Sequence, residues 1–188
     1  MVRSIYHSVA DWLKTVLPAI VLSLLAWFAI GQLTALAATG QAILQGTADD
    51  DDLVGVVNFE ETESGLLIQS NLTKAPNGTH GFHIHEFGSC ADVGNAAGGH
   101  YNPDGVKHGL LSRDGFTNAH AGDLGNIEVS QGKASYQATL PGLSLSGGQY
   151  PVAGRAVIVH EKPDDFGQPT GNAGGRIGCG TVTLTNPA

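Results

Sequence analysis

The sequence predicts an all-β domain, a Greek-key β-sandwich or flattened barrel of about eight antiparallel strands with two long functional loops, preceded by one N-terminal hydrophobic helix. Three observations lead to this prediction. Short apolar-rich runs recur at regular spacing from Thr39 onward, and no helical periodicity follows residue 38. The 27 glycines, beside only 6% aromatic residues, indicate many tight turns.

The first 38 residues form a segment distinct from the rest. Arg3 and Lys14 give it a positive start, and no further charge occurs before Asp49. The apolar stretch 16–38 is about as long as the core of a signal peptide can be, and Ala35 and Ala37 fit the small-x-small cleavage pattern.

Two interpretations of this segment remain open. The stretch 16–38 could also span a bilayer as an uncleaved anchor. We favour cleavage after Ala37 because Gln32 and Thr34 are polar. A buried core helix is disfavoured, since no second apolar segment follows to pack against it. We therefore expect a signal peptide or membrane anchor at 1–38 and an exported domain at 39–188.

The expected strands are short and separated by turn-forming residues. They cover residues 41–45, 53–59, 66–72, 81–87, 127–129, 134–140, 154–160 and 177–184. Residues 130–133 indicate a hairpin turn, and no helix is expected after residue 38. The stretches 88–123 and 161–176 lack the regular spacing of short strands and are expected to be loops. Long loops in a compact domain are usually functional.

Charge and cysteine content narrow the class of protein. The formal net charge of −8 argues against nucleic-acid binding, which needs clustered Lys and Arg. The two cysteines, Cys90 and Cys179, allow one intramolecular pairing. An exported domain favours a disulfide, with two free buried thiols as the alternative. Such a bridge would contribute about 4–5 kcal/mol in the chain-entropy model.

The histidines indicate a metal site. His83 and His85 alternate in an expected strand and so point to one face, where neutral imidazoles can bind a metal. His80 has the other parity and is expected to be structural. Further candidates lie in or beside the long loops: His100, His108, His120, Asp123 and His160. Three histidines with one aspartate suit tetrahedral zinc, and an all-nitrogen set suits copper(II).

Several motifs together carry a family resemblance. They are GFHIHEFG at 81–88, GHYNP at 99–103, KHG at 107–109, GDLGN at 122–126, GR at 154–155, VHEK at 159–162 and GNAGGRIGCG at 171–180. In this order they resemble the copper/zinc superoxide dismutases, over about residues 41–184. The resemblance implies an oxidoreductase that dismutates superoxide in an antioxidant role, with copper and zinc as cofactors and a homodimeric assembly.

The resemblance also implies roles for individual residues. Copper would be bound by His83, His85, His100 and His160, and zinc by His100, His108, His120 and Asp123. His100 would bridge both metals and carry a proton to the product. Arg176 would dock the superoxide anion, with Lys162 as a second, weaker candidate. Asp164 would link a copper-binding to a zinc-binding histidine, and Cys90 would pair with Cys179.

The sequence departs from the family pattern in its loops. The stretches between Cys90 and His100 and between His108 and His120 differ in length from the animal cytosolic pattern, and the loop from His160 to Arg176 is short. A non-catalytic relative, for example a copper-delivery or zinc-only domain, is the rival interpretation. Such a relative is expected to lack a copper ligand or the docking arginine, and both are present here.

Overall fold

The computed structural model describes residues 37–48 and 52–186. The predicted signal peptide or membrane anchor lies outside these residues, apart from its last two. Within the described ranges, no helix has the length and apolar character needed to cross a membrane.

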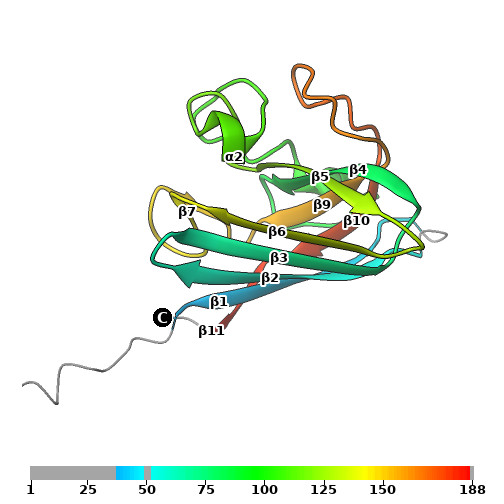
Figure 1. Cartoon of the computed structure of the whole chain (residues 1–188), viewed down its shortest axis with the longest axis horizontal. Coiled ribbons are helices and arrows are strands. Elements are labelled where there is room, and N and C mark those ends of the chain that lie inside the picture. Colours follow the sequence, from blue (N-terminus) through cyan, green and yellow to red (C-terminus); the bar gives the residue numbers. More distant parts are fainter. Residues whose placement is uncertain (1–36, 49–51, 187–188) are drawn as a thin grey trace, which may run out of the picture. The chain divides into compact units, whose positions relative to one another are not determined.

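The described chain forms a mostly antiparallel sheet that curls into a nearly closed barrel (Figure 1). Its strands follow the order β5-β4-β9-β10-β1-β2-β3-β6, with β11 paired to β1. They are β1 (Thr39–Gly46), β2 (Val54–Thr62), β3 (Gly65–Lys74), β4 (Gly78–His85), β5 (Asp123–Val129), β6 (Ala134–Leu140), β9 (Ala156–His160), β10 (Arg176–Thr181) and β11 (Thr183–Asn186). Consecutive strands β3 and β4 are not neighbours, whereas β3 pairs with β6 and β4 with β9, an order typical of Greek-key folds.

Alternating side chains fill the barrel. In β2 and β3 every second residue is buried, as expected when one face of a strand meets the core and the other meets solvent. Phe59, Phe82 and Ile84 are among the largest fully buried side chains. Phe82 packs edge-on against Tyr136, with ring centroids 5.1 Å apart. Each such side chain contributes about 1.5–3 kcal/mol when buried.

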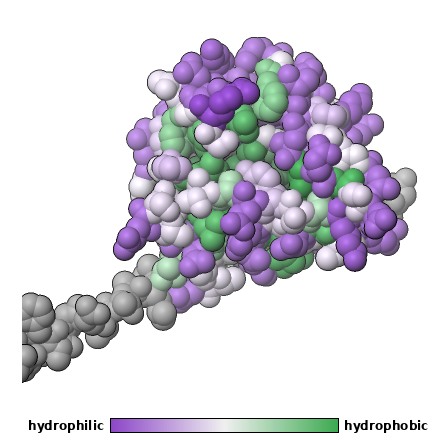
Figure 2. Space-filling view, viewed as in Figure 1, coloured by the Kyte–Doolittle hydropathy of each residue, from purple (hydrophilic) through white to green (hydrophobic). Residues whose placement is uncertain are grey.

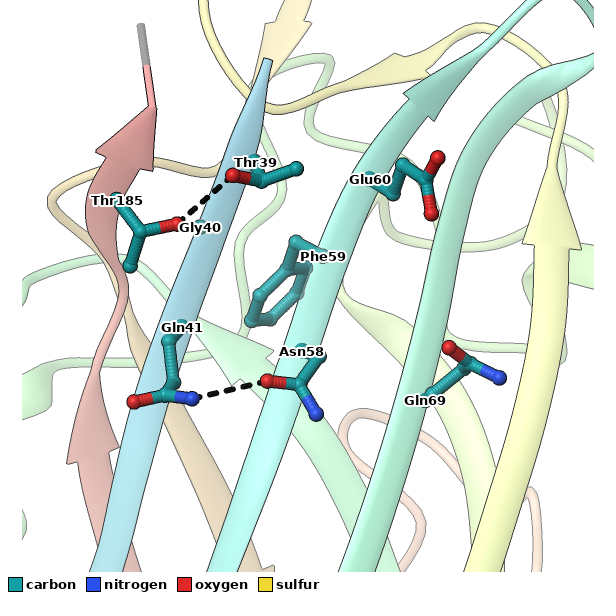
Figure 3. A pocket seen from close by; sticks show the side chains of 8 residues that line it. All are labelled: Thr39, Gly40, Gln41, Asn58, Phe59, Glu60, Gln69 and Thr185. Carbon is teal, nitrogen blue, oxygen red and sulfur yellow. Dashed lines mark hydrogen bonds between the residues drawn. The ribbon is translucent and has the colours of Figure 1, made fainter. Parts of the chain in front are cut away.

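The outer face of β11, β1, β2 and β3 carries polar side chains, together with the exposed apolar side chains of Ile43 and Leu184. Gln41 donates to Asn58 over 2.9 Å, and the hydroxyls of Thr39 and Thr185 are 2.9 Å apart (Figure 3). These residues line a shallow depression of about 250 Å³ that contains one acidic residue, Glu60, and no histidine. This face therefore carries none of the predicted metal chemistry.

The structure corrects the prediction that no helix follows residue 38. The first long loop contains a 3-10 turn, η1 (Asn95–Ala97), and one turn of α-helix, α2 (Leu111–Asp114). A single turn is too short to leave a periodic pattern in the sequence. The two-residue strands β7 (Leu143–Ser144) and β8 (Tyr150–Pro151) were likewise not predicted. The loop that carries α2 and the loop after β9 both project above the barrel as drawn, where the surface is mainly hydrophilic (Figures 1 and 2).

Candidate metal centre

The predicted ligands come together beside the neighbouring strands β4 and β9. These neighbouring strands supply His83, His85 and His160, and an isolated bridge joins His85 to His100 of the long loop. All seven predicted ligand side chains are buried: His83, His85, His100, His108, His120, Asp123 and His160. Their potential ligand atoms form two four-membered groups that share His100.

The first group consists of His83, His85, His100 and His160, whose ligand atoms all lie within 4.8 Å of one another. His85 Nε2 and His160 Nε2 are 3.2 Å apart. The other nitrogen of His85, Nδ1, lies 3.0 Å from the Gly98 carbonyl oxygen, which fixes the tautomer with Nε2 free to bind. His83 Nδ1 is buried without a hydrogen-bond partner, as expected of a nitrogen aimed at a metal.

The second group consists of His100, His108, His120 and Asp123. Asp123 Oδ1 lies 2.8 Å from His100 Nδ1 and 3.1 Å from His120 Nδ1. The Nδ1 atoms of His100 and His120 are 3.4 Å apart. His108 Nδ1 lies 2.9 Å from Asp123 Oδ2. Ligands of tetrahedral zinc lie about 3.3–3.4 Å from one another. The separation of His100 and His120 matches this value, and the separations from Asp123 are shorter. Three imidazoles and one carboxylate are a donor set that zinc takes.

Burial keeps the first group in the neutral form that binds metals. It lowers the pKa of His83 and, together with the neighbouring His100, moves the pKa of His85 well below its usual value. Burial also lowers the pKa of His100 to about 4 and that of His160 to about 3. All four imidazoles are therefore neutral at pH 7, and an all-nitrogen set suits copper(II).

The second group concentrates negative charge. Burial opposes ionisation of Asp123, but hydrogen bonds with His100, His108 and His120 outweigh it and hold the pKa of this carboxyl far below its usual range. Burial also acts to lower the pKa of His108, but its contacts with Asp123 and Asp164 raise that pKa to about 9. A divalent cation fits a site with a fixed carboxylate, and it would displace the His108 proton.

Asp164 connects the two groups. Its Oδ2 lies 2.8 Å from His83 Nε2, and its Oδ1 lies 2.9 Å from His108 Nε2. Sequence reasoning missed the residue that holds Asp164. The Asn126 side chain accepts a hydrogen bond from Asp164 N over 2.8 Å and donates to Asp164 O over 2.9 Å. Its only signal in the sequence is its place at the end of the GDLGN motif.

Arg176 lies beside the first group. It pairs with His160 across β10 and β9, and its guanidinium donates to the carbonyls of Gly94 and, over 2.6 Å, of Gly98. The Gly98 carbonyl thus holds both Arg176 and the His85 ring. A fixed guanidinium next to buried neutral imidazoles is a group that can attract a small anion.

The structure contains the disulfide between Cys90 and Cys179, with Cα atoms 5.7 Å apart. Cys179 lies on β10 three residues after Arg176, and Cys90 begins the turn that presents Gly94 and Gly98. The disulfide therefore ties the arginine's strand to the carbonyls that orient it.

Reducing the disulfide is expected to loosen this loop and to speed metal loss before the barrel unfolds. Chelator-accessible metal, measured alongside circular dichroism with and without reductant, would show the effect. Native protein should label with close to zero thiols per chain, and labelling near two per chain would rule the bridge out.

Two further candidates lie outside both groups. His80 is buried, with Nδ1 2.8 Å from the His160 carbonyl and Nε2 3.0 Å from the Pro76 carbonyl. Its contacts are structural, as expected. The Lys162 side chain is exposed, and its backbone pairs with Gly81 and Ala173.

Comparisons with known proteins agree with this geometry. The family model for copper/zinc superoxide dismutase (SODC) matches residues 53–182. The chain is 39% identical over 138 residues to an extracellular copper–zinc superoxide dismutase of Caenorhabditis elegans, covering 70% of this chain and 61% of that protein. It is 39% identical over 143 residues to copper–zinc superoxide dismutase A of Xenopus laevis, covering 72% of this chain and 92% of that protein.

A solved structure is also similar. The crystal structure of the clock protein EA4 matches with a TM-score of 0.68 and 33% identity, covering 79% of this chain and 96% of that chain.

Proposed function

Because this chain belongs to the copper/zinc superoxide dismutase family, whose members are oxidoreductases, we propose that it converts superoxide to oxygen and hydrogen peroxide. One observation carries the proposal: two buried four-ligand groups share a single imidazole, His100. One group is all-nitrogen and the other contains a carboxylate, so the pair suits two different metals.

Copper and zinc are the cofactors of this family. We assign copper to His83, His85, His100 and His160, and zinc to His100, His108, His120 and Asp123. Copper held by the first group would supply one-electron redox chemistry, by which one superoxide is oxidised to oxygen and a second is reduced, with two protons from solvent, to hydrogen peroxide. Asp164 and the Gly98 carbonyl orient the imidazoles through the nitrogens that do not bind metal.

The chain's own groups guide the substrate and a proton. Arg176 attracts superoxide to the copper group, which offsets the repulsion expected from a chain with net charge −8. His100 Nε2 can take a proton from solvent and give it to the peroxide product. Its Nδ1 stays on the zinc side, next to Asp123 Oδ1. His100 and Arg176 are therefore the proposed catalytic residues.

The rival function is that of a non-catalytic metal carrier on the same fold. All seven ligands and Arg176 are present, and Arg176 is held at the copper group, which favours the enzyme. Superoxide decay measured with the metal-loaded protein, with and without a copper chelator, separates the two. A carrier would bind metal without accelerating the decay.

We propose that residues 1–38 export the domain, as a cleaved signal peptide or an uncleaved anchor. The disulfide and the extracellular relative support export. We also propose a homodimer, because Ile43 on β1, Leu184 on β11 and Phe87 after β4 expose large apolar side chains. A sedimentation experiment that finds only monomer would contradict the dimer.

Cleavage has a simple optical consequence. Both tryptophans, Trp12 and Trp27, precede the expected cut after Ala37, so the released protein should show no tryptophan fluorescence. Emission spectra of protein recovered without detergent test this. Strong tryptophan emission from such a preparation would contradict cleavage.

A further inference from the structure

The two loops that depart in length from the family pattern meet at one zinc-site residue, His108. From the short loop after β9, three alternate residues contact it: Asp164, Phe166 and Gln168. The role of Asp164 follows from the family resemblance. The proposed dismutation of superoxide gives no role to the contacts of Phe166 and Gln168 with His108.

The Gln168 side chain makes two hydrogen bonds with the backbone of His108. The His108 N–H donates to Gln168 Oε1 over 3.0 Å, and Gln168 Nε2 donates to the His108 carbonyl over 2.9 Å. One side-chain amide thus satisfies both backbone groups of the residue, as a neighbouring strand would. The Gln168 side chain is exposed, so it can be replaced without disturbing the core.

Phe166 covers the His108 ring. The two rings are stacked, with centroids 6.5 Å apart and planes inclined by 18°. Phe166 has a φ of 59°, an unfavourable value for an aromatic residue, and its N–H donates to Asp164 Oδ1 over 2.8 Å. The guanidinium of Arg113, from α2, lies 5.3 Å from the Phe166 ring centre. The ring thus connects the two loops.

These side chains border an open depression of about 550 Å³. Its lining includes Lys107, His108, Arg113, Phe166 and Gln168. His108 is nevertheless buried, and its contacts with Phe166 and Gln168 contribute to this burial. A movement of His108 away from Asp123 that shifts its backbone would break the two hydrogen bonds with Gln168 and the ring stack with Phe166.

We propose that Phe166 and Gln168 are positioning residues that hold His108 for zinc and thereby set how slowly the protein releases it. The proposal rests on the proposed zinc site. The short loop after β9 would then stabilise the zinc site through its contacts with His108, without itself contacting either metal.

Gln168→Met keeps the length of the side chain and removes both hydrogen bonds. We expect zinc release to a chromogenic chelator to become about tenfold faster, since each bond contributes modestly. Copper release should not change, because Gln168 contacts no copper ligand in the described structure. Gln69→Met is the matched control: Gln69 donates to Gln137 on the outer face of the sheet, and its loss should leave zinc release unaltered.

A second pair of variants tests the ring. Phe166→Leu removes the stack and should speed zinc release, whereas Phe166→Tyr keeps the ring and should restore the parent rate. Hydrogen exchange of the His108 amide in the metal-free protein gives a readout without zinc. Exchange should be slow in the parent and faster in Gln168→Met, because the N–H loses its acceptor.

The outcomes separate the two proposals. Unaltered zinc release and amide exchange in Gln168→Met would overturn the positioning role alone. Equal acceleration of zinc and copper loss, with a matching fall in unfolding temperature, would make both residues merely structural and overturn it too. A parent that takes up no zinc would instead overturn the proposed metal site.

Discussion

The His160→Ala protein is expected to retain zinc, to bind almost no copper and to lose superoxide dismutation by more than about a hundredfold. His160 belongs to the all-nitrogen group and has no part in the group that contains Asp123. Its main-chain carbonyl, which meets the His80 ring, is kept in the variant. The loss should therefore be confined to one metal.

Metal analysis of the purified variant, alongside its rate of superoxide removal, checks this expectation. His120→Ala is the matched counterpart, because His120 lies only in the second group. That variant should lose zinc first. If His160→Ala kept a full complement of copper, the assignment of the first group to copper would be wrong.

Replacing Arg176 with leucine should leave both metals bound and slow the reaction about tenfold or more, as expected for the loss of one charge-assisted contact. The guanidinium touches the Gly94 and Gly98 carbonyls rather than any metal ligand directly. Its effect should therefore appear in the capture of the anion. Arg176→Lys keeps the charge and should recover part of the rate.

Salt dependence distinguishes docking from a structural role. The parent rate should fall as ionic strength rises, because salt screens the attraction of the anion to Arg176. The leucine variant should respond less steeply. Loss of copper in the variant would make Arg176 structural, acting through Gly98 on His85. Unchanged rate and salt response would exclude it as the docking residue.

The sequence predicted those features that depend on local pattern. Short apolar-rich runs located β2 and β3, and the His-x-His spacing predicted that His83 and His85 share one side of β4. The number of histidines in and beside the long loops indicated that further ligands would join them. Which residues hold copper and which hold zinc was predicted only through the family resemblance, because distant residues such as His83 and His120 have no local relation in the sequence.

The unpredicted features depend on contacts between distant segments. Gln168 looks like any polar loop residue, yet it pairs with the backbone of His108, 60 positions earlier. Asn126 similarly holds Asp164 from 38 positions away. The helix α2 has only one turn, and its Arg113 matters through the Phe166 ring that it meets in space. No periodicity in the sequence encodes such pairings.

The most direct test of the central claim is the decay of superoxide in the presence of the purified protein carrying copper and zinc. We expect decay that is accelerated in proportion to protein concentration, that falls to the background rate when a chelator removes copper, and that returns when copper is added back. Protein that binds both metals but leaves the decay at its uncatalysed rate would contradict the account.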